Sequence, residues 1–187
     1  MQAFHLDDHG WCLEARHVPS PNCDDRPEGT AVVLGVIHNI SLPPGEFGGP
    51  YIEALFTNTL DPATHPYFES IHTLRVSAHF LIRRDGQLLQ FVPVNRRAWH
   101  AGVSVWQGRE RCNDFSLGIE LEGTDFQPFT AEQYQTLSRL ALALQQRYPL
   151  AAWQGHSDIA PGRKTDPGAY FDWDQFRAGL TAALADK

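Results

Sequence analysis

Side chains that could bind a metal ion occur at two distant places in the sequence. His38 follows an apolar run, whereas His156 and Asp166 share one later segment, which Pro161 and Pro167 stiffen. Imidazole nitrogen and carboxylate oxygen are zinc donors, and three protein ligands leave a fourth position for water, as in catalytic zinc sites. Such an ion lowers the pKa of its water to about 7. Spacing alone leaves other triples open among the 9 histidines, and a lone histidine after an apolar run is also typical of a hydrogen-bonded core residue.

Two more side chains could take part in the same chemistry. Glu120 lies within the apolar stretch LGIELEG, where a carboxylate is costly unless it is paired, hydrated or near a cation. It could act as a general base, or it could lie on a solvent-exposed face of the strand. Lys164 closely precedes Asp166 and could stabilise a tetrahedral oxyanion, although most lysines are simply exposed on the surface.

In the first half of the chain, the sequence predicts a loop, a strand, a short helix and a hairpin that could position these residues. Residues 1–31 are polar and rich in proline, which predicts a loop over the domain surface. Residues 31–40 are apolar and β-branched, which predicts a buried central strand. A short helix is expected within residues 51–60, and a β-hairpin over residues 76–94 with its turn at Asp85-Gly86.

The second half predicts one more strand and two helices. Residues 115–123 alternate as a strand, with Glu120 on the face opposite the leucines and isoleucine. Thr130 and Gln133 have the spacing of a capping box, and the helix that they begin should stop near Pro149. A final helix is expected within residues 171–186. The sequence therefore predicts an α/β protein with α+β character, in which helices flank a central mixed β-sheet.

Length and composition limit the possible classes of function. The chain has 187 residues, and we expect a single domain over 1–187. Its net charge of −7 argues against nucleic acid or a membrane surface as a partner. No apolar run is long enough to cross a bilayer, and no secretory signal is evident. The 3 cysteines have no CxxC spacing and suggest reduced thiols. We therefore expect a cytoplasmic protein, and a monomer.

Five stretches of the sequence form an ordered set of motifs: VIHNISLPPGEFGG, HPYF, LRVSAHFLIRRDGQLLQFVP, RAWHAGVSVWQGRERCNDFSLGIELEGTD and GHSDIAPGRKTDPG. Together they resemble the zinc-dependent N-acetylmuramoyl-L-alanine amidases, and within them the cytoplasmic branch that acts on 1,6-anhydro-muropeptides. The resemblance extends over residues 11–176. It implies the amidase and peptidoglycan-recognition fold, and one Zn²⁺ per chain held by His38, His156 and Asp166. It also implies catalytic roles for Glu120 and Lys164.

The resemblance further implies the reaction and the substrate. These enzymes hydrolyse the amide between the lactyl group of muramic acid and the L-alanine of the stem peptide. The cytoplasmic branch prefers the anhydro-sugar form released during cell-wall turnover, and in some species its activity keeps β-lactamase induction low. In this sequence, Glu120 would take the proton of the attacking water and Lys164 would stabilise the oxyanion.

Matching segments supply candidate substrate-binding residues. They are Asn39, Tyr67, Arg75, Trp99 and Arg111. Arginine can bind the carboxylates of a stem peptide in a bidentate manner, and an indole can lie against a sugar face. The alternatives are a core position for the tryptophan and solvated arginines. Of the remaining histidines, His79 should be packed and hydrogen-bonded, and His100 could border the groove.

Two other functions stay open at this stage. One is a muropeptide-binding module without catalysis, since proteins with this fold can lose metal ligands, although all of the expected ligand positions are present here. The other is an exported amidase that acts on polymeric peptidoglycan, against which the lack of a signal peptide argues.

Overall fold

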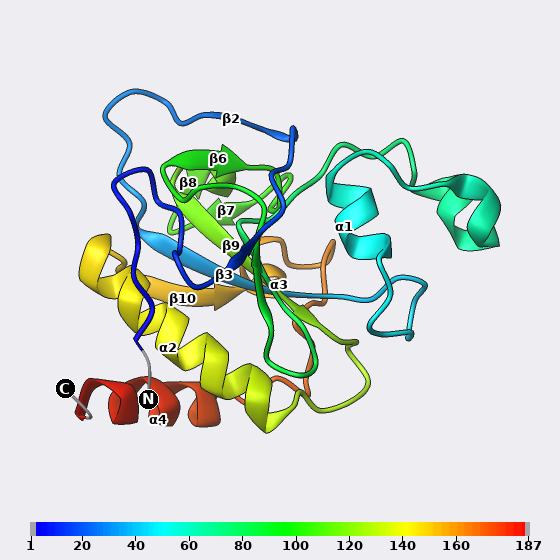
Figure 1. The fold of residues 1–187 in the computed structure, drawn as a ribbon. Helices are drawn as coiled ribbons and strands as arrows, with labels where there is room; N and C mark the ends of the chain where they lie inside the picture. Colours follow the sequence, from blue (N-terminus) through cyan, green and yellow to red (C-terminus); the bar gives the residue numbers. More distant parts are fainter. Residues whose placement is uncertain (1–2, 186–187) are drawn as a thin grey trace.

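The computed structural model describes residues 3–185, and its centre is a six-stranded mixed sheet (Figure 1). The strand order is β1-β5-β4-β9-β3-β10. The strands are β1 (Arg16–His17), β3 (Leu34–Ile40), β4 (Phe80–Ile82), β5 (Leu88–Gln90), β9 (Ser116–Glu122) and β10 (Ala152–Gly155). The four neighbours β4, β9, β3 and β10 run parallel, and β5 is antiparallel to β4. The predicted mixed sheet is therefore confirmed.

The remaining elements are short strand pairs and helices. The strand pairs are β2 (Cys23–Asp25) with β6 (Arg96–Ala98) and β7 (Val105–Trp106) with β8 (Arg109–Glu110). The α-helices are α1 (Tyr51–Phe56), α2 (Ala131–Arg147), α3 (His156–Ile159) and α4 (Trp173–Ala185), and the 3-10 helices are η1 (Pro62–Thr64), η2 (Pro66–Ser70) and η3 (Cys112–Asp114). None of the helices within residues 3–185 has the length and apolar character needed to span a membrane.

The two long strands in the middle of the sheet bury both of their faces. In β3 and β9, Ile37 pairs with Ile119, and the next pair is His38 with Glu120. Side chains alternate between faces along a strand. Ile37 and Ile119 therefore belong to the core beneath the long helices, while His38 and Glu120 point to the opposite face. His38 and Glu120 thus directly follow two core residues in their strands but point away from the larger core.

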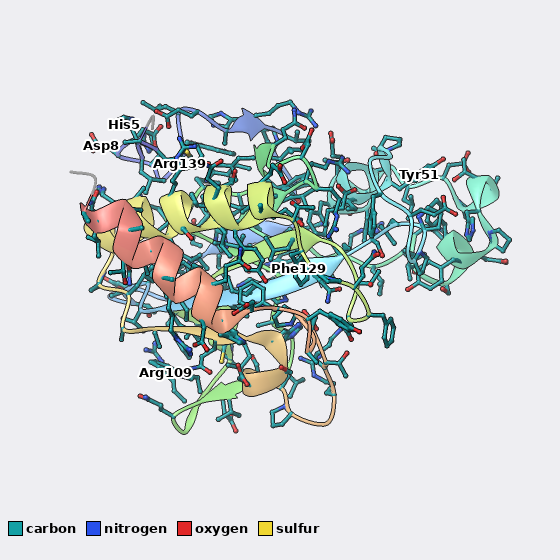
Figure 2. All side chains as sticks on the ribbon, turned by 90° about the horizontal axis from the view of Figure 1, so that it is seen from below. His5, Asp8, Tyr51, Arg109, Phe129 and Arg139 are labelled. Atoms are coloured by element: carbon teal, nitrogen blue, oxygen red, sulfur yellow. The ribbon has the colours of Figure 1, made fainter. Side chains whose placement is uncertain are left out.

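The long helices α2 and α4 lie side by side over one face of the sheet (Figures 1 and 2). Their apolar residues form one core with the strands, and Phe129, at the start of this layer, is buried in it. The predicted capping box at α2 is confirmed: Thr130 Oγ1 accepts from Gln133 N at 3.1 Å, and Gln133 Oε1 accepts from Thr130 N at 3.1 Å.

The opposite face of the sheet is covered by α1 and the turns that follow it. The short helix predicted within residues 51–60 is confirmed as α1, in which Ile52, Leu55 and Phe56 are all buried. They pack with Phe68 from η2 and with Leu81 from β4. Figure 2 shows this part of the chain, marked by Tyr51, extending to one side of the sheet.

The structure differs from the sequence prediction in several local features, and the sequence did not predict strands β6, β7, β8 and β10. Residues 16–17 and 23–25 form short strands within the expected N-terminal loop, because β5 and β6 offer them distant partners. The hairpin strands are only three residues each, and at its turn Gly86 has a positive φ whereas Asp85 does not. Residues 156–159 make one helical turn within the segment that Pro161 and Pro167 are expected to stiffen, with Asp158 Oδ2 accepting from Gly155 N at 2.7 Å.

Candidate metal centre and groove

The candidate site lies where three parallel strands end at the same edge of the sheet. Gly155, the last residue of β10, pairs with Ile37 of β3, so the next residue, His156, follows beside His38. On the other side of β3, His38 pairs with Glu120 of β9. In open α/β sheets, binding sites form at the carboxyl ends of parallel strands. The register therefore brings residues from three remote parts of the chain together.

Three donor atoms converge in this place. His38 Nδ1 lies 3.0 Å from His156 Nδ1 and 3.0 Å from Asp166 Oδ2, and His156 Nδ1 lies 3.2 Å from the same carboxylate oxygen. Bonds of about 2.0 Å at tetrahedral angles imply ligand atoms roughly 3.3 Å apart. The spacing of the three atoms and their chemical types fit a tetrahedral zinc ion.

The two histidines offer these atoms from buried positions. His38 is 1% exposed and His156 is 3% exposed. The outer nitrogen of His156, Nε2, lies 2.9 Å from the carbonyl oxygen of Ala101. A carbonyl only accepts, so His156 carries its proton on Nε2 and has a free lone pair on Nδ1. That is the nitrogen that faces His38 and Asp166.

The Asp166 carboxylate is held on a well-anchored segment. Ser157 N donates to the backbone oxygen of Asp166 at 2.9 Å. Burial opposes ionisation of Asp166, but its close contacts with the imidazole rings of His156 and His38 outweigh burial in the metal-free protein and hold the pKa of this carboxyl well below its ordinary value. Asp166 is therefore anionic at neutral pH, as a candidate metal ligand must be.

Asp125 connects the segments that carry two of the candidate ligands. Its Oδ1 accepts from Asn39 Nδ2 at 2.6 Å, and its Oδ2 accepts from the hydroxyl of Thr165. Asn39 follows His38, and Thr165 precedes Asp166. Asn39 Nδ2 also donates to the carbonyl of Pro167 at 3.0 Å, so both of its hydrogens are engaged. The sequence analysis did not single out Asp125, because nothing in its local pattern indicates these distant partners.

Glu120 lies beside the three donors and has an unusual environment. It is buried, and its Oε2 has no hydrogen-bond partner among the described residues. Burial raises the pKa of its carboxyl well above the ordinary value, the Asp166 charge adds to this, and Lys164 partly opposes it. The alternative that Glu120 lies on a solvent-exposed face is therefore wrong. A buried, unpaired carboxyl next to candidate metal ligands can accept a proton from a bound water.

A cavity of about 810 Å³ opens over this cluster. Among the predicted catalytic and substrate-binding residues, those that line it are Asn39, Tyr67, Trp99, Glu120 and Lys164. Trp99 is partly engaged elsewhere, because its Nε1 donates to Asp24 Oδ1 at 3.2 Å.

Two predicted substrate-binding residues lie outside the lining of this cavity. Arg111 is exposed and pairs with Asp114 at 3.3 Å, which directs its guanidinium to its own turn. Arg75 is exposed and donates to the backbone carbonyls of residues 72–74. The neighbours of Arg75 in the sequence, Leu74 and Val76, line the cavity, whereas no lining residue lies between His100 and Glu120, where Arg111 is found. Both arginine side chains contact acceptors in their own turns.

Other lining residues were not predicted from the sequence. Ser77, Phe126, Arg163 and Thr165 line the cavity, the last two from the same segment. His100, expected only to border the groove, is among the residues that line it and contacts His38. His79 is buried, and Gly118 N donates to its Nδ1 at 3.0 Å, as expected for a packed histidine.

Comparisons with known proteins show which family this chain resembles. Residues 28–169 match the family model described as N-acetylmuramoyl-L-alanine amidase. The 1,6-anhydro-N-acetylmuramyl-L-alanine amidase AmpD of Citrobacter freundii is 63% identical over 178 residues, which are 94% of this chain and 95% of the relative. The corresponding protein of Escherichia coli K12 is 62% identical over 174 residues, 92% of this chain and 95% of the relative.

A solved structure shares the fold closely. The crystal structure of a Se-Met AmpD derivative superposes with a TM-score of 0.90 at 62% identity, covering 94% of this chain and 99% of that chain. The family match includes the segments that carry all three donor residues, and the relatives align over nearly the whole length. The chain belongs to the N-acetylmuramoyl-L-alanine amidase family of hydrolases.

Proposed function

We propose that this protein is a zinc-dependent amidase that cleaves anhydro-muramyl peptides between the lactyl group of 1,6-anhydro-N-acetylmuramic acid and L-alanine. The observation that carries this proposal is the convergence of His38, His156 and Asp166 beneath an open cavity, with Glu120 beside them. The names of the relatives support the substrate. Zinc is the metal proposed because two imidazoles and one carboxylate are a typical catalytic zinc set.

The residues divide the chemistry among them. A bound zinc ion would polarise the scissile carbonyl and acidify water in its open coordination position. Glu120 accepts the proton of the attacking water and delivers it to the leaving nitrogen. Lys164 donates to the oxygen that becomes negative in the tetrahedral state. A carbon–oxygen bond forms and the carbon–nitrogen bond breaks, which yields a lactyl carboxylate and a peptide with a free amine.

The cavity walls supply the groups for substrate recognition. Tyr67 is 42% exposed in η2 and presents an aromatic surface with a polar tip to the cavity. The Trp99 ring is available for the sugar face. Asn39 has both amide hydrogens engaged, so any contact with the substrate would be through Oδ1. The predicted role of Arg75 and Arg111 in substrate binding has less support, because neither residue lines the cavity.

The proposal extends to the biological setting. The anhydro-muramyl substrate named for the relatives supports a cytoplasmic role in peptidoglycan recycling, with an influence on β-lactamase induction, and the three free cysteines fit a reducing compartment. We propose that the protein acts as a monomer with one zinc ion per chain.

One experiment separates the three candidate functions. Purified protein is analysed for zinc and incubated with a soluble anhydro-muramyl tripeptide and, separately, with intact sacculi, and the products are identified by mass spectrometry. We expect one zinc ion per chain, release of the tripeptide from the soluble substrate and little action on sacculi. Zinc with bound but uncleaved substrate would indicate a binding module, and preferential release from sacculi would indicate a wall-degrading amidase. Asp166→Ala is the control that lacks a ligand.

A further inference from the structure

We propose that the dipeptide His100–Ala101 positions both metal-binding histidines by hydrogen-bonding to their outer ring nitrogens. His100 Nδ1 lies 2.8 Å from His38 Nε2, and the carbonyl oxygen of Ala101 lies 2.9 Å from His156 Nε2. Two consecutive residues thus reach two histidines that lie far apart in the sequence. This inference rests on the proposed zinc site and concerns the residues that hold its ligands in place, not the ligands themselves.

Hydrogen-bond chemistry fixes the direction of each contact. Metal binding through His38 Nδ1 requires that nitrogen to be unprotonated, so the proton of the neutral ring lies on Nε2. His38 Nε2 then donates, and His100 Nδ1 accepts. His100 in turn carries its proton on Nε2, which lies 3.2 Å from Ser116 Oγ. The chain of contacts runs from the candidate metal ligand to a hydroxyl on β9.

The dipeptide is itself held in place by groups that do not touch the metal. Asn113 Oδ1 accepts from His100 N at 3.2 Å and from Ala101 N at 2.8 Å. The His100 ring lies against Gly118 of β9, where an added Cβ would come within 2.5 Å of Cγ of the ring. The absence of a side chain at Gly118 therefore makes room for the imidazole. Gly118 and Ser116 contact the His100 ring, and Asn113 holds its backbone. The ring can therefore orient His38 without help from the metal.

Ala101 receives a second donor on its carbonyl. Arg163 Nη2 lies 2.5 Å from that oxygen, and Arg163 also donates to the carbonyl of Val103. A carbonyl oxygen has two lone pairs and can accept from both His156 and the guanidinium. Arg163 therefore holds the Ala101 carbonyl in place, and this carbonyl keeps the proton of His156 on Nε2. Partners of this kind typically account for 10–100-fold in metal affinity.

His79 provides a matched comparison on the same sheet. It is as buried as the ligands, and its ring centroid lies 5.9 Å from that of His100. Its Nδ1 accepts from Gly118 N, and its Nε2 lies 2.9 Å from the carbonyl oxygen of Arg96. Within the described residues, its hydrogen bonds therefore go to backbone groups and to Arg26, and not to a candidate ligand.

The test compares two side chains of similar shape at position 100. Asparagine places an oxygen where His100 has Nδ1 and keeps the acceptor, whereas leucine places a methyl group there. Zinc affinity is measured by competition with a chromophoric chelator. We expect His100→Leu to weaken zinc binding by roughly 10–100-fold, and His100→Asn and the control His79→Asn to remain within a few-fold of the wild type. Equal affinity of His100→Leu and the wild type would overturn the proposal.

A spectroscopic measurement keeps the test decisive if His100→Leu does not fold. In the zinc-loaded wild type, long-range ¹H–¹⁵N spectra of the imidazoles should show His38 bound through Nδ1, with a slowly exchanging proton on Nε2. A His38 ring without that proton, or bound through Nε2, contradicts the proposal. If the wild type binds no zinc, or Asp166→Ala binds it equally well, the proposed function fails instead.

Discussion

At the scale of single residues, two glutamates on one face of β9 have different environments. Glu122 is 2% exposed and accepts from Arg83 Nη1 at 3.0 Å and from Gly48 N at 2.7 Å. Glu120, also buried, has an oxygen without a partner among the described residues and lies beside the candidate ligands. A carboxylate that is fully hydrogen-bonded stabilises the fold, and one that is not can exchange a proton. The surroundings of the two glutamates therefore give Glu122 a structural role and suit Glu120 to proton transfer, although the residue type is the same.

Replacing Glu120 with glutamine tests its role as a base. Glutamine keeps the shape of the side chain but cannot accept the proton of water. We expect the turnover of Glu120→Gln to fall by about 10²–10⁴-fold, the usual contribution of a general base, while the zinc content stays at the wild-type level. Turnover and metal are measured on the same preparation. Near-normal turnover of Glu120→Gln would remove this residue from the mechanism.

The raised pKa of Glu120 also predicts a pH dependence of stability. Its ordinary value is 4.5, and burial raises the pKa well above this. Between the two values the folded protein keeps a proton that the unfolded chain has lost, so the free energy of unfolding decreases as the pH rises through this window. In the metal-free protein, Glu120→Gln should therefore gain stability relative to the wild type between pH 4.5 and neutral pH. Urea denaturation over a pH series measures this difference.

The control for this prediction is Glu122→Gln. Arg83 and the backbone at Gly48 lose a charged acceptor there, so this variant should be less stable than the wild type at neutral pH. A stability difference between Glu120→Gln and the wild type that does not vary with pH would contradict the inferred titration.

At the scale of elements, the layer of α2 and α4 supports the sheet without touching the candidate site. The capping box at Thr130 satisfies backbone N–H groups at the start of α2, and Thr130 Oγ1 also donates to the carbonyl of Arg84 at 2.7 Å. We expect Thr130→Ala to lower the free energy of unfolding by about 0.5–2 kcal/mol. Chemical denaturation measures the loss.

Thr130→Ser is the matched control, because serine keeps the hydroxyl, and it should retain most of the stability. Neither variant should change zinc affinity, since α2 packs on the face of the sheet opposite His38 and Glu120. A marked loss of zinc binding in Thr130→Ala would show that the two faces are coupled more strongly than the packing indicates.

At the scale of the whole molecule, the candidate metal site connects segments that only the folded chain brings together. His38 comes from β3, and His156 and Asp166 come from the segment after β10. An ion that binds the folded state and not the unfolded chain stabilises the fold by mass action. We expect zinc at 100 times its Kd to raise the free energy of unfolding by about 2.7 kcal/mol.

Thermal unfolding with and without zinc checks this expectation. Removal of zinc by a chelator should lower Tm and abolish hydrolysis together, and added zinc should restore both. His38→Ala, which lacks one ligand, should show a smaller shift in Tm with zinc. A shift that is the same in His38→Ala and the wild type would place the ion elsewhere.

The sequence by itself determined the elements whose signals are local. The apolar β-branched run predicted the strand with His38, alternation predicted the strand with Glu120, and the capping box placed the start of α2. Five sequence motifs also indicated the family, and this resemblance implied the three candidate ligands. The predictions of these elements are confirmed because burial periodicity and hydrogen bonding to near neighbours depend on a few consecutive residues, whereas the assignment of the ligands stays a prediction.

Only the tertiary structure decided which side chains face the groove and which groups hold the ligands. Arg75 and Arg111 turn to acceptors in their own turns, whereas Asp125 and His100 contact residues that are distant in the sequence. The register of the parallel strands sets these contacts, and parallel neighbours are joined by long connections rather than by a local turn. Sequence spacing therefore carries no information on which distant atoms will meet.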